Sequence, residues 1–205
     1  YVAVPETGPT GRAAHSQGFL TVARERAERT VTELAPRVDE GWDIVVVEPS
    51  DAVMLQSDYK DLLSGGEVSL VAEYTYGLCE YLDRHELTDT IGWQSDDSAS
   101  LAYHGHCHQK ATRKDHHAVA VLRGAGFEVD ALDSSCCGMA GSFGYETEHY
   151  SMSKAVGELL FRQVDESPGE RVVAPGASCR TQLEDRDSGS TPPHPVQVLA
   201  EAVRT

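Results

Sequence analysis

Four cysteines in the second half of the sequence are the residues whose type and spacing could do chemistry. They are Cys107, Cys136, Cys137 and Cys179, while a fifth, Cys79, stands apart from them. The adjacent pair cannot easily form a disulfide with itself, because consecutive α-carbons lie only about 3.8 Å apart. The odd number of cysteines also disfavours a secreted disulfide framework. Four thiolates instead suit an iron–sulfur cluster or a closed zinc site.

The elements around these cysteines are predicted to bring them together. Short β-branched or alternating runs predict strands at 43–47, 100–104, 127–132 and 171–174, and apolar periodicity predicts helices at 17–34, 116–122, 149–164 and 196–203. Alternating strands and helices indicate an α/β fold with mostly parallel sheets flanked by helices. Each of the last three strands is followed by a loop that carries one or two of the four cysteines. Because the carboxyl ends of parallel strands meet at one edge, we expect the four thiols to converge there.

Histidines and glycines near the cysteines could assist a metal centre. His104 and His106 lie just before Cys107, and zinc could take one of them in place of a thiolate. Because four cysteines already complete a coordination shell, hydrogen-bonding or strand-end roles are favoured for both histidines. Gly138 and Gly141 let the backbone approach closely, so their N–H groups could donate to cluster sulfides. The same glycine-rich loop could cradle a dinucleotide, but its spacing departs from G-x-G-x-x-G.

A weak internal repeat divides the chain. The segment 45–55 resembles the segment 172–183, since each has a β-branched strand, a proline turn and a helix start. We therefore expect two pseudo-repeated halves, residues 1–92 and 93–205, with cysteines at the strand ends of the second half only. In the first half Ala52 stands roughly where Cys179 stands in the second, so this half is expected to bind no metal.

Composition excludes several classes of protein. The 205 residues include 17 Lys and Arg against 33 Asp and Glu, and the net charge of −16 excludes a general nucleic-acid binder. No apolar run approaches the roughly 20 residues that span a bilayer, and no signal peptide is visible. We expect a cytoplasmic protein, at most peripheral at the inner face of the membrane. The dispersed acidic surface, poor in lysine, fits a halophilic protein, and the start at Tyr1 suggests a fragment of a longer chain.

Three motifs together resemble a known family. They are His106-Cys107-His108, the run from Ser135 through Cys136-Cys137-Gly138 to Gly144, and Pro175-Gly176-Ala177-Ser178-Cys179. They are similar to the cysteine-rich CCG domain that occurs in the B subunit of heterodisulfide reductase and in the iron–sulfur subunits of glycolate oxidase and anaerobic glycerol-3-phosphate dehydrogenase. The branch that looks most similar is the carboxyl-terminal part of FAD-linked D-lactate dehydrogenase-like oxidoreductases.

This resemblance implies a function. Cys107, Cys136, Cys137 and Cys179 stand where the family's cluster ligands stand, and they suffice for one cubane [4Fe-4S] cluster. The chain would be a non-catalytic electron-transfer domain that receives electrons from an FAD-binding domain of the same chain or complex. The whole oxidoreductase would oxidise a D-2-hydroxy acid such as lactate, glycolate or 2-hydroxyglutarate. A structural zinc module and a thiol–disulfide redox domain are the alternatives.

Overall fold

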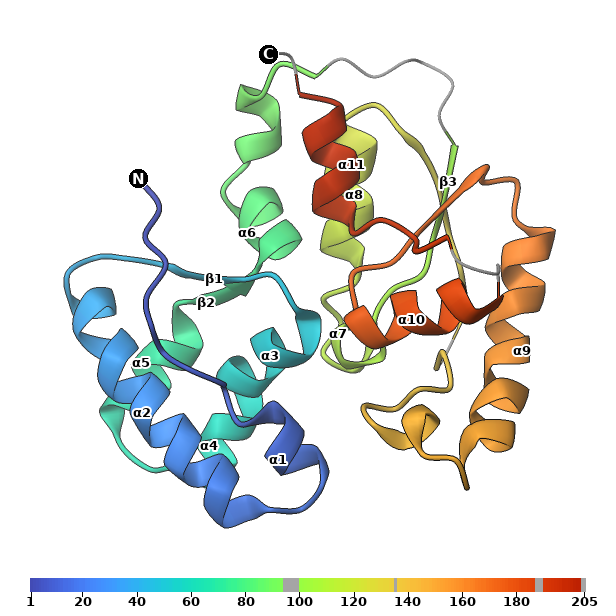
Figure 1. Ribbon diagram of the computed structural model, residues 1–205. Helices are drawn as coiled ribbons and strands as arrows, with labels where there is room; N and C mark the ends of the chain where they lie inside the picture. The colour runs from blue at the N-terminus through green and yellow to red at the C-terminus, as the bar shows by residue number, and fades with distance from the viewer. Residues whose placement is uncertain (94–99, 135, 187–189, 204–205) are drawn as a thin grey trace. The chain divides into compact units, whose positions relative to one another are not determined.

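The computed structural model describes residues 1–93, 100–134, 136–186 and 190–203. The chain divides into two compact units, unit 1 (Tyr1–Gly77) and unit 2 (Leu78–Thr205) (Figure 1). Both units combine helices with parallel strands, so the predicted α/β class is confirmed. The division into repeated halves at residue 92 stays a prediction. The two compact units are defined by contacts within the chain, and these do not test whether the halves are repeats.

Unit 1 is a helical layer packed beside a small sheet. Its elements are α1 (Arg12–Ser16), α2 (Leu20–Asp39), β1 (Ile44–Val46), α3 (Pro49–Val53), the π-helical turn η1 (Met54–Asp58), α4 (Tyr59–Leu62), α5 (Gly66–Glu73) and β2 (Thr75–Gly77). The two strands pair in parallel, with Ile44 opposite Thr75. The core of unit 1 lies where α2 packs against α4 and α5, and Ala27, Tyr59 and Val71 are fully buried in it.

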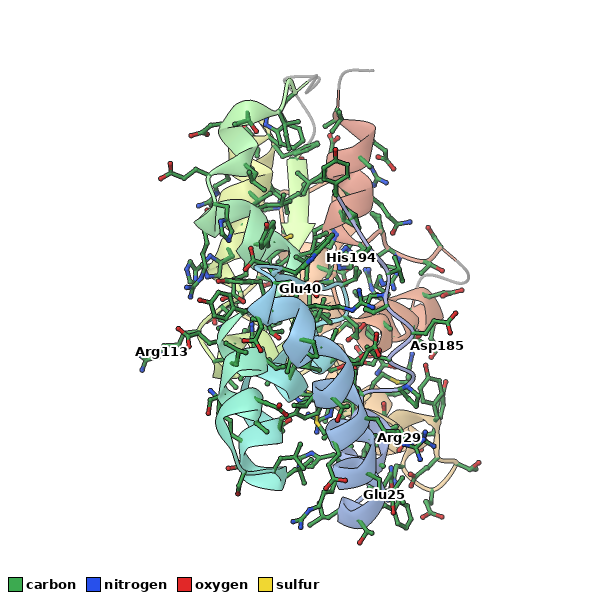
Figure 2. All side chains as sticks on the ribbon, turned by 90° about the vertical axis from the view of Figure 1, so that its left-hand side faces the viewer. Glu25, Arg29, Glu40, Arg113, Asp185 and His194 are labelled. Atoms are coloured by element: carbon green, nitrogen blue, oxygen red, sulfur yellow. The ribbon has the colours of Figure 1, made fainter. Side chains whose placement is uncertain are left out.

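Helix α2 owes its form to one apolar stripe. Its buried residues recur every three or four positions, whereas Glu25 and Arg29 extend from the exposed side of the helix (Figure 2). The sequence predicted a helix over 17–34, but the observed helix ends later and contains Pro36. A proline removes one intrahelical hydrogen bond, and the helix continues past it to Asp39 because Val38 is buried in the core.

Unit 2 is a three-layer sandwich. Its elements are α6 (Leu78–Arg84), the 3₁₀ turn η2 (Leu87–Thr90), β3 (Ser100–Tyr103), α7 (Cys107–Ala111), α8 (His116–Gly124), β4 (Glu128–Ala131), the 3₁₀ turn η3 (Phe143–Tyr145), α9 (Tyr150–Glu166), β5 (Arg171–Val173), α10 (Ala177–Arg186) and α11 (Pro195–Glu201). The sheet has the order β4-β3-β5, and all of its pairings are parallel.

The two faces of the central strand β3 carry two separate cores. Leu101 and Tyr103 pack with α6, α8 and α11 on one face. Ala102 packs on the opposite face with residues of α9 and α10, including Leu160 and Leu183. Cys79, the cysteine that stands apart in the sequence, is buried in the first of these cores. The double-faced burial fixes β3 and therefore the loop that leaves its carboxyl end.

The strand β2 was not among the strands predicted from the sequence. Residues Thr75–Gly77 form it, and α6 starts directly after it at Leu78. The three residues of β2 are too few to show a strand period, and only their pairing with β1 defines them. Within the described residues, no helix combines the length and apolarity needed to cross a membrane.

Candidate metal centre

The loops at the carboxyl ends of the three strands of unit 2 carry the predicted site residues. His104 directly follows β3, and Cys107 begins α7 shortly after it. Cys136 and Cys137 lie in the loop that follows β4, and Cys179 lies in the first turn of α10, beyond β5. The predicted convergence therefore follows from the strand order, because β3 stands between the other two strands.

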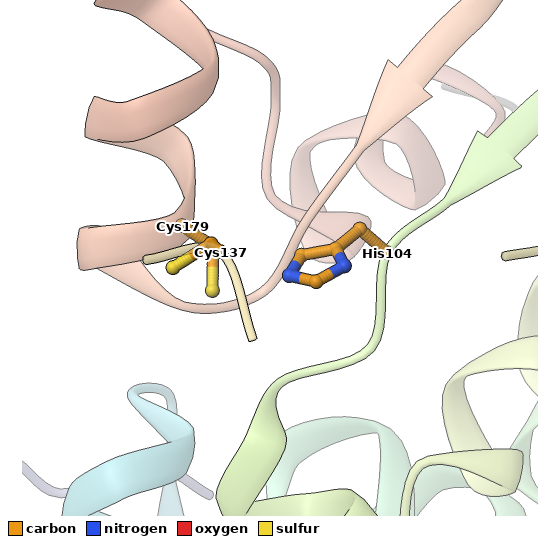
Figure 3. A group of neighbouring side chains, drawn as sticks. All are labelled: His104, Cys137 and Cys179. Atoms are coloured by element: carbon orange, nitrogen blue, oxygen red, sulfur yellow. The ribbon is translucent and has the colours of Figure 1, made fainter. Parts of the chain in front are cut away.

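Three ligand-type side chains meet in the interior. The donor atoms of His104, Cys137 and Cys179 lie within 4.8 Å of one another, and these residues are 0%, 4% and 1% exposed. Figure 3 shows the imidazole at the end of β3 turned toward the two neighbouring thiols. One histidine nitrogen and two cysteine sulfurs are a donor set that zinc or an iron–sulfur centre accepts.

The orientation of His104 is set by one of its two ring nitrogens. Nδ1 lies 2.5 Å from the Ser134 hydroxyl oxygen. The carbonyl oxygen of Ser134 in turn accepts a hydrogen bond from Lys110 Nζ, which also reaches the Leu132 carbonyl at 3.1 Å. Burial, followed by the nearby Lys110 charge, lowers the pKa of His104 to about 4. The imidazole is therefore neutral at physiological pH and able to ligate a metal.

The other ring nitrogen of His104 shows that the site fits a metal. Nε2 is buried and has no hydrogen-bond partner among the described residues. A buried polar atom without a partner is costly, and such atoms commonly mark a missing ion or water. Because this histidine belongs to the same group as the Cys137 and Cys179 sulfurs, the residues present fit a bound metal.

The remaining two cysteines extend the thiol cluster outward. The Cys136 side chain interacts with that of Cys137, and the Cys137 and Cys179 sulfurs lie within 4.8 Å of each other. Cys107 interacts electrostatically with Cys136, and both are partly exposed. Cys136 and Cys107 do not belong to the compact group formed with His104. The structure thus brings all four predicted thiols to one edge, with Cys137 and Cys179 innermost.

Backbone N–H groups surround the sulfur atoms. The N–H of Gly138 donates to the Cys136 sulfur at 3.3 Å. The neighbouring amides of Ala140 and Met139 act to lower the pKa of Cys136 and of Cys137, respectively. Together these three successive amides form a cradle that favours negative charge on sulfur. The sequence predicted Gly138 as such a donor but missed Met139 and Ala140, because a backbone donor has no side-chain signature.

The cradle depends on Gly138 having no side chain. Its φ of +96° is left-handed, and a Cβ there would overlap the carbonyl oxygen of Ser153 and lie 3.0 Å from Gln182 Nε2. Gly141 also has a positive φ, of +70°, but a Cβ there would meet nothing within 4 Å. Of these two glycines, the close approach of the cysteine loop to α9 therefore requires only Gly138.

His106 has a different place from His104. Its Nδ1 accepts a hydrogen bond from the His108 backbone N–H, so it caps the helix that Cys107 begins. It is buried against Gly176, where a Cβ would overlap its ring. These contacts position Cys107. His106 does not belong to the group of His104, Cys137 and Cys179.

The surroundings of Cys136 and Cys137 favour the neutral thiol. A hydrogen bond to Cys137, then burial, raises the pKa of Cys136 well above its usual value. The pKa of Cys137 is lowered by the hydrogen bond from Cys136, but its bond to Cys179 and burial outweigh this and raise it to about 12. A nucleophilic cysteine has a depressed pKa. The site therefore suits metal binding, which displaces the protons, better than thiol–disulfide exchange.

The fold and the thiol–imidazole group define unit 2 as a cysteine-rich α/β domain with a candidate metal centre. Residues 101–184 match the model of the family described as CCG, cysteine-rich domain. This matched segment contains all four clustered cysteines.

The chain is also similar to parts of larger dehydrogenases. It is 28% identical to the C subunit of anaerobic glycerol-3-phosphate dehydrogenase from Escherichia coli K12, over 92% of this chain and 48% of that protein. It is 28% identical to D-2-hydroxyglutarate dehydrogenase from the same strain and 26% identical to that of Pantoea ananatis, over 96% and 95% of this chain but 19% of each relative. The chain thus spans about half or less of the relatives it matches, and the similarity extends through both units.

Proposed function

We propose that unit 2 is an iron–sulfur electron-transfer domain of a flavin-dependent oxidoreductase. A [4Fe-4S] cluster would be held by Cys107, Cys136, Cys137 and Cys179, and when bound it supplies one-electron transfer. The observation that carries this proposal is the gathering of the four cysteines at one sheet edge, with the Cys137 and Cys179 sulfurs within 4.8 Å of each other and the Gly138 amide donating to Cys136. The similarity to dehydrogenases supports the redox role.

The residues of the chain have defined tasks in this proposal. The cysteines bind, the amides of Gly138, Met139 and Ala140 compensate negative charge on sulfur, and the buried faces of Cys137 and Cys179 exclude water. Hydrogen bonds to sulfur and low exposure are two of the factors that set the potential of such a centre. No residue of the site is assigned as a general base or nucleophile.

The complete oxidoreductase would join this chain to an FAD-binding domain of the same polypeptide or complex. Its substrate would be a D-2-hydroxy acid, namely lactate, glycolate or 2-hydroxyglutarate. The name of one group of relatives supports this substrate class. We also propose that the protein is cytoplasmic or peripheral at the inner face of the membrane, and that its dispersed negative charge suits high salt.

Anaerobic reconstitution of the full-length protein with iron and sulfide tests this function. We expect about four iron atoms per chain, a broad absorption near about 400 nm that dithionite bleaches, and a paramagnetic resonance signal on reduction. Adding a D-2-hydroxy acid in place of dithionite should give the same reduced signal. A colourless protein that retains one zinc ion after anaerobic purification would contradict the proposal.

A structural zinc site is the second candidate, and the position of His104 favours it. His104, Cys137 and Cys179 would supply three of the four ligands that structural zinc requires. The two candidates make different predictions for substitutions at Cys107 and His104. If the centre is the four-thiolate cluster, Cys107→Ser should abolish metal binding; if it is the zinc site, His104→Gln should abolish binding and Cys107→Ser should leave most of it.

If His104 binds the metal, its partner Ser134 also matters. Ser134→Ala removes the hydroxyl that holds the imidazole, and we expect about 10- to 100-fold weaker zinc affinity, measured by competition with a chelator. Ser142→Ala is the matched control, because Ser142 lies in the cysteine loop but its hydroxyl bonds to Glu146. Equal affinities of the two variants would mean that Ser134 has no part in ligation.

A further inference from the structure

A second group of metal-ligand side chains in unit 2 contains no cysteine. It consists of Asp83 in the last turn of α6, and of His116 and His117 in the first turn of α8. One donor atom from each of the three side chains lies within 4.8 Å of the other two. Two imidazoles and a carboxylate are ligands that zinc and related divalent ions accept. The group is therefore chemically suited to a metal ion other than the one at the thiols.

The two helices hold this group beside a packed core. Helices α6 and α8 are in contact, and Cys79 of α6 and Val121 of α8 are buried in the same core. Asp83 comes one helical turn after Cys79, and His117 comes one turn before Val121. Because residues four apart share a helix face, the carboxylate and the imidazole lie at the rim of that core. Their positions are thus set by helix packing, which places ligands more precisely than a loop does.

The contact between Asp83 and His117 joins the two helices directly. Asp83 Oδ2 lies 2.6 Å from Nδ1 of His117, whose side chain is only 9% exposed. Two ligands of a tetrahedral zinc ion are about 3.4 Å apart, since each bond is about 2.1 Å long. A small turn of the half-exposed carboxylate opens the contact by this amount. An ion can then take the place of the proton between the two atoms, as metal binding generally displaces protons from its ligands.

His116 provides the third donor. Its side chain is exposed, and the centroid of its ring lies 4.0 Å from that of His117, with 36° between the planes. Within the described part of the chain, the His116 side chain has no hydrogen bond or ion pair. A metal ion would therefore displace only water from this imidazole.

The charges around the group favour a cation. Lys114 and Arg84 both pair with Glu80, at 2.8 Å and 3.2 Å. The ion-pair partner of Asp83 among the described residues is His117, and a histidine that ligates a metal is neutral. The three side chains would then carry one negative charge, which a divalent ion compensates.

A third group of ligand-type side chains, Glu146, Glu148 and His149, lacks these features. His149 Nδ1 lies 2.9 Å from Glu146, but the His149 ring stacks on Phe143 with centroids 4.1 Å apart. None of the three side chains is buried, and only one is an imidazole. Exposed acidic side chains often gather without an ion, so this group serves as a control.

We propose that Asp83, His116 and His117 form a second metal site, which binds one zinc ion with water as the remaining ligand. Three protein ligands and a water are the usual arrangement of an open zinc site. The bound ion clamps the end of α6 to the start of α8. The site shares no residue with the thiol centre, so neither the cluster nor the redox role proposed above is needed for it.

Zinc counting on the full-length protein tests the proposal. After dialysis of the metal-free protein against a zinc buffer, His116→Ala should bind about one zinc ion fewer per chain than the parent protein. Loss of an outer partner of a ligand already weakens affinity about 10- to 100-fold. Loss of the ligand itself should therefore weaken this zinc by at least about 100-fold in competition with a chelator. Equal zinc content and affinity in the two proteins overturn the proposal.

His149→Ala is the matched control for His116→Ala, because it removes an imidazole that also lies beside a carboxylate. It should keep the zinc content of the parent protein. If it loses zinc as His116→Ala does, the ion is held by surface histidines in general, and the proposed site is wrong.

Two further variants separate this site from the thiol centre. Cys137→Ser should retain the zinc ion of the second site, and its X-ray absorption should show nitrogen and oxygen at about 2.0–2.2 Å with no sulfur at about 2.3 Å. A sulfur shell would contradict the proposal. Asp83→Asn keeps the shape of the side chain without its charge, so zinc should raise its thermal midpoint less than that of the parent protein. Equal shifts would show that Asp83 is not a ligand, and the comparisons in the parent background do not depend on how Cys137→Ser folds.

Discussion

Replacing Cys137 or Cys179 by serine is expected to abolish metal binding by the protein. Both thiols are almost fully buried and lie in the group that includes His104. Serine is a poor ligand for iron and zinc compared with thiolate. The iron content after anaerobic reconstitution should fall from about four atoms per chain to less than about a tenth of that value.

Cys79→Ser is the matched control for these two variants. Cys79 is also buried, in the core that β3 forms with α6, α8 and α11, but it is not among the clustered thiols. Burial, with a smaller effect of Asp83, raises the pKa of Cys79 to about 12, so it stays a neutral thiol. The control should keep its full iron content while losing some stability. If all three variants lose iron equally, the proposed ligand set is wrong.

The sequence was sufficient to predict the sheet edge at which the thiols meet. Each of the strands 100–104, 127–132 and 171–174 was expected within one residue of its observed bounds, because buried parallel strands have compact β-branched or alternating runs. The cysteines follow these strands directly in the chain. Their convergence was therefore a consequence of topology, and no knowledge of side-chain packing was needed.

The finer arrangement of the site depends on packing that periodicity does not encode. His104 and His106 are two residues apart and similar in sequence context, yet one points at Cys137 and Cys179 and the other caps α7. The difference arises because His104 still belongs to the end of β3, whereas His106 begins a helix. Lys110 and Ser134, which fix the imidazole through the loop carbonyl and hydroxyl, had no recognisable signal in the sequence.

Gly138→Ala is expected to have the second large effect, on both stability and metal binding. Alanine at a left-handed φ costs roughly 1–2 kcal/mol, and overlap of its Cβ with the Ser153 carbonyl adds about 1–3 kcal/mol. Relief of that overlap requires the cysteine loop to move away from α9. The N–H of Gly138 would then move away from the Cys136 sulfur, and the metal content after reconstitution should fall with the stability.

Gly141→Ala separates the two causes, because Gly141 shares the positive φ but has open space around it. This variant should lose only the backbone cost of about 1–2 kcal/mol and keep its metal. Urea unfolding of the metal-free proteins measures the difference, and iron analysis after reconstitution measures the consequence for the site. If the two variants unfold at the same urea concentration, the contact between the cysteine loop and α9 does not constrain the site. If Gly138→Ala is the less stable variant yet retains full metal, the cradle of backbone amides is not needed to hold the centre.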